Sequence, residues 1–290
     1  MTRQMRAAAG RARIPLRESA DLVADFLLSL QCEDGGFRGR AAHSDLYYSA
    51  FALQSLASLE APIPSGVREY LNGFDPATLD LVHLGCLARA LAALPEGLAG
   101  TEAAQRIHRQ LDRFRAEDGG YAEEPNQLHS SAYASFFAVG VCEDTAMPVA
   151  DVDALFDRLE GLATPDGAYT NSAEFPVPTT PNTAAAVVVH HQFDRQVRPE
   201  TLNWLEKRFC ESGGFLAIPD APMPDLLSTA VTLQALSLAR RSLESFREPC
   251  LDFMDELWTG RGAFRGYRGE REVDCEFTFY GLLGLGLLTE

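Results

Sequence analysis

Acidic residues recur at the start of apolar segments in this 290-residue chain. Asp45, Asp80, Asp225 and Asp274 each lead such a segment, and Glu276 follows Asp274 by two residues. A carboxylate in this position has two uses. It accepts hydrogen bonds from free backbone N–H groups as a helix N-cap, or it takes part in proton transfer. Capping alone accounts for the four aspartates, so any acid–base role depends on where the helices bring these side chains.

A short glycine-containing turn that ends in an aromatic residue precedes each of these segments. It occurs six times, as DGGF (34–37), NGF (72–74), DGGY (118–121), DGAY (166–169), SGGF (212–215) and RGAF (261–264). The segments that follow lead from Asp45, Asp80, Gln127, Thr179, Asp225 and Asp274, at spacings of 35 to 52 residues. A repeat of this period indicates stacked supersecondary units, because one unit cannot bury its apolar face alone.

Two kinds of helix alternate along the chain. The segments before the turns, such as 19–31, 102–114, 151–162 and 199–209, place apolar residues at three- and four-residue intervals, which is typical of a helix with one solvated face. The segments after the turns are apolar or small on nearly every face and require cover on all sides. The alternation predicts an all-α (α/α)6 toroid over residues 18–290, with six parallel inner helices whose N-termini meet at one rim. We expect any functional site at that rim.

Composition excludes several classes of protein. The net charge of −16 disfavours nucleic acid as a partner, and no apolar run approaches the roughly 20 residues of a membrane-spanning helix. Residues 1–17 contain five arginines and no acid, which predicts a basic, disordered tail and leaves an organellar address open. The cysteines have no paired C-x-x-C spacing, which favours reduced thiols and a cytoplasmic location.

The turn and the later inner helices resemble those of two related families. QCEDGGF (31–37), PDLLSTAVTLQAL (224–236) and VDCEFTFYGLLGLGLL (273–288) resemble the repeats of protein prenyltransferase β-subunits and of squalene/hopene-type (class II) terpene cyclases. The resemblance extends from about Glu18 to the end of the chain. It implies a toroid with an aromatic-lined funnel that holds isoprenoid chains, and the activity must then be argued from the residues of this site.

The zinc site of the prenyltransferase β-subunits is incomplete in this sequence. The resemblance places Asp225 at the aspartate ligand, but Leu227 at the cysteine and Phe277 at the histidine. The segment 217–224 contains no cation that could clamp a diphosphate. We therefore predict no zinc and no other cofactor, with Asp225 the only retained ligand. A non-standard metal site formed by Asp225, Cys275 and Glu276 stays a minor alternative.

The class II cyclases protonate an alkene with the middle aspartate of a D-x-D-D motif at the start of an inner helix. On the fifth helix this position is Leu227, whereas on the sixth it is Glu276, with Asp274 just before it. The resemblance therefore implies that Glu276 is the catalytic acid, with Asp274 and Asp225 as its polar support. In the alternative interpretation, Asp274 caps its helix and Glu276 only offsets the helix dipole.

Aromatic side chains near the helix starts are candidates for substrate binding, since their faces stabilise a carbocation. We assign this role to Tyr47, Tyr48, Phe277, Phe279 and Tyr280, and a polar binding role to His129 at the rim. Core packing is the alternative role for the aromatic residues, and structural hydrogen bonding is the alternative for the histidine.

Three functions remain open at this point. The favoured one is an enzyme that acts on an isoprenoid or other long apolar small molecule through carboxylates at the rim. The first alternative is a non-catalytic toroid that binds lipid or scaffolds a partner protein. The second is a prenyltransferase β-like subunit that requires a helical-repeat partner.

Overall fold

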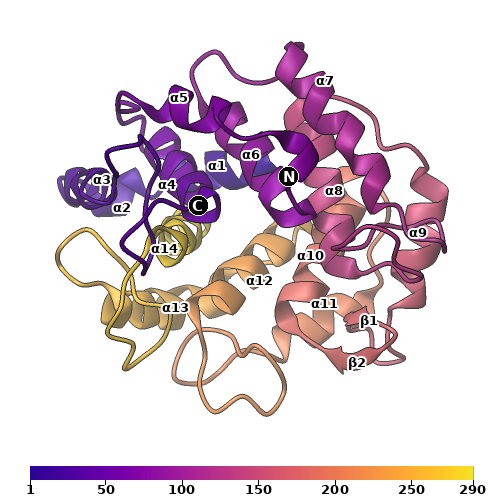
Figure 1. Ribbon diagram of the computed structural model, residues 1–290. Helices are drawn as coiled ribbons and strands as arrows, with labels where there is room; N and C mark the ends of the chain where they lie inside the picture. Colours follow the sequence, from indigo (N-terminus) through magenta and orange to yellow (C-terminus); the bar gives the residue numbers. More distant parts are fainter. Residues whose placement is uncertain (290) are drawn as a thin grey trace.

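The computed structural model describes residues 1–289 and is built mainly from helices. An outer layer of helices surrounds an inner layer (Figure 1). The inner helices are α4 (Leu46–Ser58), α6 (Leu81–Ala93), α8 (Ala132–Thr145), α10 (Thr180–Gln192), α12 (Leu226–Leu238) and α14 (Cys275–Leu287). The outer helices are α3 (Ser19–Leu28), α5 (Val67–Asn72), α7 (Glu102–Arg109), α9 (Val152–Gly161), α11 (Pro199–Glu206) and α13 (Glu244–Leu257).

The inner helices form a closed ring. Each packs against the next in chain order, and α14 returns to pack against α4. The apolar sequence of these helices explains their place, because each has neighbours on both sides and an outer helix behind it. The predicted (α/α)6 toroid is confirmed.

Five of the six glycine turns have the same backbone geometry. Their central glycine has a positive φ, as at Gly35 (92°), where a Cβ would also lie 2.2 Å from the carbonyl oxygen of Gly66. The aromatic residue that ends each of these turns is buried. In four units its backbone N–H donates to a Ser or Thr hydroxyl one turn into the following inner helix, as Phe215 does to Thr229 at 2.9 Å. This bond fixes the turn to the start of the inner helix.

The second and third units depart from the expected pattern. Gly73 has a φ of −70° and ends α5 as an ordinary C-cap, and a 3-10 helix, η1 (Pro76–Thr78), follows it. The third inner helix begins at Ala132 with Ser131 as its N-cap, not at Gln127 as predicted. A second 3-10 helix, η2 (Gln110–Phe114), continues α7. The additional loop residues place His129 outside the helix.

A small hairpin was not expected. Strands β1 (Thr170–Ser172) and β2 (Phe175–Pro178) pair antiparallel between the fourth turn and α10. Phe175 and Val177 are largely exposed, so the hairpin lies on the surface and leaves the helical architecture unchanged.

The prediction that residues 1–17 form a disordered tail is wrong. They form α1 (Thr2–Gly10) and α2 (Arg13–Leu16), and α1 packs against α14, α4 and α8. Its apolar residues recur at helical spacing and are buried, at Met1, Met5, Ala8, Ala9 and Ala12. They cover the end of the ring where the inner helices finish, as shown by the hydrogen bonds from Arg6 to the Ala92 carbonyl and from Arg11 to the Gly286 carbonyl. The prediction of disorder rested on the five arginines and did not take this apolar stripe into account.

The lengths of the helices bear on membrane insertion. Across residues 1–289 no helix combines the length and the apolar character that crossing a bilayer requires.

The turn carboxylate Asp118 gives a test of how the turns stabilise the fold. Its side chain accepts hydrogen bonds from the backbone N–H of Gly120 and from the N–H and hydroxyl of Ser130. Burial opposes ionisation of Asp118, but these bonds and the charge of Arg158 outweigh it and hold its pKa below the usual range. We expect Asp118→Ala to lower the free energy of unfolding by about 1–2 kcal/mol at pH 7.

The pH dependence of that loss has a defined sign. A depressed folded-state pKa contributes stability above the unfolded value of about 3.9, and this contribution disappears as pH falls through the folded pKa. Urea unfolding should therefore show that the free energies of unfolding of wild type and Asp118→Ala differ less at acid pH than at pH 7. Asp157→Ala, an exposed substitution on α9, is the matched control and should change stability little at either pH. An undiminished difference at low pH would contradict this account of the turn.

Candidate active site

A cavity lies inside the ring of inner helices, between their N-terminal ends and α1. It has a volume of about 120 Å³. Its wall is built at three levels. The second residue of five inner helices lines the upper level, as Tyr47, Tyr133, Pro181, Leu227 and Glu276. The fifth and sixth residues line the middle, and the ninth residues of α6, α10 and α12 line the deep level above Met5 of α1.

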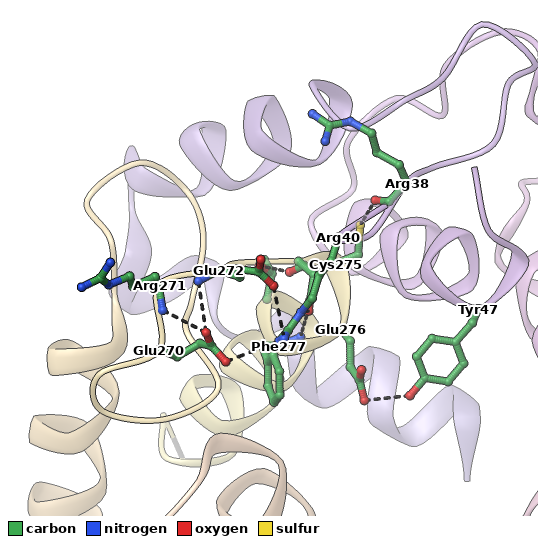
Figure 2. Close-up of polar contacts among 11 residues, drawn as sticks. Arg38, Arg40, Tyr47, Glu270, Arg271, Glu272, Cys275, Glu276 and Phe277 are labelled. Atoms are coloured by element: carbon green, nitrogen blue, oxygen red, sulfur yellow. Dashed lines mark hydrogen bonds and ion pairs between the residues drawn. The ribbon is translucent and has the colours of Figure 1, made fainter. Parts of the chain in front are cut away.

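Glu276 brings a carboxyl group to this cavity, where Tyr47 faces it (Figure 2). Both are the second residues of neighbouring inner helices, α14 and α4. The Tyr47 hydroxyl donates to Glu276 Oε1 at 2.7 Å, which leaves Oε2 without a partner among the described residues. The side chain is therefore oriented by one oxygen while the other is free to exchange a proton with a ligand.

The environment of Glu276 favours its protonated form. Burial raises its pKa, the hydrogen bond from Tyr47 lowers it, the charge of Asp274 raises it and that of Arg40 lowers it, with a net increase. A partly buried carboxylic acid whose conjugate base accepts a hydrogen bond is suited to general acid catalysis, because burial favours the protonated form and the hydrogen bond stabilises the carboxylate that forms.

Arg40 holds a cluster of carboxylates at the rim beside this cavity (Figure 2). Its Nε donates to Asp274 Oδ2 at 3.1 Å, and its terminal nitrogens lie 3.4 Å from Glu272 and 3.7 Å from Glu270. Asp274 is 1% exposed, and its other oxygen accepts from the N–H of Phe277 as the N-cap of α14. Asp274 thus caps the helix and is neutralised by Arg40, and it acts on Glu276 only through its charge.

The aromatic residues chosen from the sequence lie in two places. Tyr47 and Tyr280 line the cavity, where Tyr47 packs edge-on against Phe51 with ring centroids 5.0 Å apart. Tyr48, Phe277 and Phe279 are not among the lining residues: Tyr48 packs against Gly39, Phe277 against Gly266 and Arg40, and Phe279 against Phe51. These three are packing residues of the rim and core.

Two predicted polar residues are also absent from the cavity wall. Asp225 caps α12, and its carboxylate oxygens accept from the N–H and the hydroxyl of Ser228, each at 2.7 Å. No hydrogen bond joins it to Glu276, and at the start of α12 it is Leu227 that lines the cavity. His129 is exposed in the longer third loop. The helix-capping interpretation therefore accounts for Asp225.

Several lining residues were not selected from the sequence. In the middle level these are Phe51, Cys86, Phe136 and Phe137, which lie beside the predicted Tyr280, and Arg89 and Gln234 lie at the deep level. Burial raises the pKa of the Cys86 thiol to about 12, so this group remains neutral. The sequence feature that could have identified Arg89 is a cation inside an otherwise apolar helix. No such feature identifies Arg40, because its contacts with the carboxylates depend on the conformation of a loop.

The side chains present do not fit a zinc ion. Nowhere in residues 1–289 do three His, Cys, Asp or Glu side chains converge in a way that could hold a metal. Leu227 and Phe277 occupy the positions that resemble ligand positions, and Asp225 is engaged by Ser228. Cys275 is buried with its thiol toward the carbonyl oxygen of Arg38, so it does not combine with Asp225 and Glu276.

Comparison with protein families agrees with this architecture. The sequence profile of the prenyltransferase alpha-alpha toroid domain matches residues 13–79, 81–176 and 182–290. The chain belongs to this family. The matched stretches include every glycine turn and all of the inner helices except the first two residues of α10. A search of curated proteins for relatives of the sequence finds no match.

Solved structures share the fold of this toroid at low sequence identity. A variant of the type II terpene cyclase MstE from Scytonema, in complex with geranylgeranyl dihydroxybenzoate, is 15% identical with a TM-score of 0.68, over 96% of this chain and 97% of that chain. A protein from Actinoplanes is 14% identical with a TM-score of 0.61, over 94% and 98%. The Lin0763 protein from Listeria innocua is 12% identical with a TM-score of 0.61, over 93% and 96%. These similarities show the fold, and the coverage of both chains shows that each of these proteins is about as long as this one.

Proposed function

We propose that this toroid binds an isoprenoid or similar apolar compound in its central cavity and protonates a carbon–carbon double bond with Glu276, as a class II-type terpene cyclase does. One observation carries the proposal: a partly buried carboxyl group, oriented by Tyr47 through one oxygen, lines an otherwise largely apolar and aromatic cavity. The Scytonema enzyme of the same fold, whose variant binds a geranylgeranyl compound, supports the class of substrate.

The proposed step balances as an isomerisation. The Glu276 proton forms a C–H bond with one alkene carbon, using the π electron pair, and leaves a carbocation at the other carbon. A second double bond of the same molecule then attacks this cation and closes a ring. The final cation loses a proton from an adjacent carbon, and that proton restores Glu276 through solvent or directly. The rings of Phe51, Phe136 and Tyr280 present π faces to the cationic intermediates.

The size of the cavity limits the ligand. Its volume of about 120 Å³ lies below the range of about 300–1,000 Å³ that is usual for small-molecule pockets. A ten-carbon chain suits this space, and a twenty-carbon chain requires wall side chains to move. The proposal is tested by incubating the purified protein with ten-, fifteen- and twenty-carbon isoprenoids and analysing the products for cyclic isomers.

Tyr47→Phe tests the orientation of the acid. Activity that requires protonated Glu276 is present at low pH and is lost as pH rises through the pKa of Glu276. Because the Tyr47 hydrogen bond lowers that pKa, its removal should move the falling limb of the pH–rate profile to higher pH. The weaker acid should also reduce the plateau rate by about 10-fold to 100-fold.

Tyr48→Phe is the matched control for this experiment. Tyr48 neighbours Tyr47 in sequence but does not line the cavity, so its variant should keep the wild-type profile. A Tyr47→Phe profile that moves to lower pH, or that overlays wild type, would show that this hydroxyl does not act on the acid.

A lipid-binding toroid is the second candidate function, and the largely apolar and aromatic lining of the cavity favours it, since a carrier needs an apolar wall but no acid. It predicts that a co-purifying lipid is retained unchanged in a Glu276→Gln variant. Loss of product formation together with retained ligand in that variant would favour the enzyme instead.

A further inference from the structure

The deep end of the cavity holds a cation without a counter-ion. Arg89, the ninth residue of α6, is 8% exposed and lines the cavity. Its Nε is buried with no hydrogen-bond partner, and within residues 1–289 its guanidinium makes no hydrogen bond or ion pair. The guanidinium carbon lies 5.9 Å from the centroid of the Phe137 ring. A buried, unpaired charge is costly, so this arrangement leaves an interaction to be completed by a ligand.

A second unsatisfied donor lines the same level. Gln234 is the ninth residue of α12, is 4% exposed, and its Nε2 is buried without a partner. Because α6 and α12 are the second and fifth helices of the six-membered ring, Arg89 and Gln234 approach the cavity from opposite sides. One cation and one amide donor therefore converge on the space above Met5, where a ligand would have to supply acceptor oxygens.

Asp144, near the end of α8, is the natural internal candidate for a counter-ion and does not fill this role. Arg89 lies near enough to lower its pKa, but burial dominates and raises the pKa of Asp144 to about 7. No ion pair joins the two side chains, and Asp144 Oδ2 instead lies 3.5 Å from the Thr2 hydroxyl. Arg89 is thus left to face the cavity.

We propose that Arg89 and Gln234 bind a carboxylate at one end of the ligand, so that the substrate is an isoprenoid acid whose chain runs from this deep site up to Glu276. This inference rests on the proposed function of the cavity. Arg89 is the only cation among the residues that line it, and a single guanidinium neutralises a monoanion such as a carboxylate but not a diphosphate. The planar guanidinium also matches a planar carboxylate.

The spacing of the two ends defines the length of this acid. Glu276 is the second residue of its helix and Arg89 is the ninth, which separates the two levels by about 10 Å at 1.5 Å per residue. A carboxylate at Arg89 therefore places the far double bond of a two-unit isoprenoid acid near Glu276, with the aromatic middle level around the chain. Geranic acid is the simplest compound with these features.

Binding of matched acids and esters tests the site without requiring turnover. Geranic acid, farnesoic acid and their methyl esters are titrated by calorimetry into wild type, Arg89→Met, Gln234→Leu and Glu276→Gln, with melting temperature as the check of folding. Wild type should bind at least one acid about 30-fold or more tightly than its ester. Arg89→Met should lose this preference while still binding the ester, and Gln234→Leu should reduce it. Glu276→Gln should keep it, although turnover is lost.

The outcomes separate this site from the proposed function. Equal binding of acids and esters by wild type, or a preference that survives in Arg89→Met, overturns the carboxylate site and leaves an apolar cavity. If none of the four compounds binds wild type, both the carboxylate site and the isoprenoid cavity are contradicted. If Arg89→Met does not fold, an unchanged acid preference in folded Gln234→Leu and in Arg89→Lys overturns the proposal, and its decrease in both supports it.

Discussion

Glu276→Gln is expected to reduce product formation by at least about 10³-fold while the protein remains folded. Glutamine has nearly the same shape, and its amide oxygen can still accept the hydrogen bond from Tyr47, so packing at the cavity is preserved. The amide carries no acidic proton, and therefore only the chemical step is removed. Product analysis under single-turnover conditions, with the melting temperature measured in parallel, gives both quantities.

The matched control is Glu272→Gln, in the loop that precedes α14. Glu272 is a largely exposed partner of Arg40 at the rim and does not line the cavity. Its substitution should leave turnover close to that of wild type. Equal losses in the two variants would assign the effect to the electrostatics of the rim and not to proton donation, and an active Glu276→Gln would eliminate Glu276 as the acid.

Gly286→Ala is expected to produce the largest loss of stability, about 3 kcal/mol in the free energy of unfolding. A Cβ at this position would lie 1.8 Å from the carbonyl oxygen of Ala8, so α14 and α1 could not keep their present separation. The same movement would break the hydrogen bond from Arg11 to the Gly286 carbonyl and displace Met5 from the floor of the cavity. Urea unfolding measures the loss, and limited proteolysis should release residues 1–17 first.

Gly161→Ala controls for the intrinsic preference of alanine for helices. Gly161 ends α9, and no atom lies within 4 Å of the position of its Cβ. That substitution should be neutral or stabilising by up to about 1 kcal/mol. If Gly286→Ala behaved in the same way, the close packing of α1 against α14 would be refuted.

The architecture could be predicted from the sequence because several features of each unit repeat together. The turn glycines, the aromatic residues after them and the apolar inner helices agree in most units, and the closed ring follows from that agreement. The departures occur where one unit lacks a repeated feature. Gly73 does not adopt the left-handed conformation, and the third inner helix begins at Ala132 after a longer loop.

The candidate site was predicted in part, for reasons that lie in helix geometry. At the second position of an inner helix, Glu276 and Tyr47 point into the ring, whereas Asp225 and Asp274 at the N-cap position turn back to the helix N–H groups. Spacing along the sequence does not by itself separate these two outcomes. The structure adds which N-cap is paired with a cation, because Arg40 arrives from a loop more than two hundred residues away.

Composition did not predict two features of the site, the helix at the N-terminus and the cation in the cavity. The arginines of residues 1–17 indicated a disordered tail, whereas Met1, Met5, Ala8 and Ala9 form the buried helical stripe that covers one end of the ring. Arg89 is a cation inside an otherwise apolar inner helix, but the sequence alone does not show that it lines a cavity. In a closed ring a lone cation in an inner helix has few places to go except the central cavity.

The most direct test of proton donation by Glu276 is cyclisation in deuterium oxide. The protein is exchanged into D₂O and incubated with the acids and methyl esters of ten-, fifteen- and twenty-carbon isoprenoids, and the products are examined by mass spectrometry and NMR. The account predicts a cyclic isomer that carries one deuterium on the carbon protonated first, and its absence with Glu276→Gln. A cyclic product without deuterium at that carbon, or no product from compounds that bind in the cavity, would contradict it.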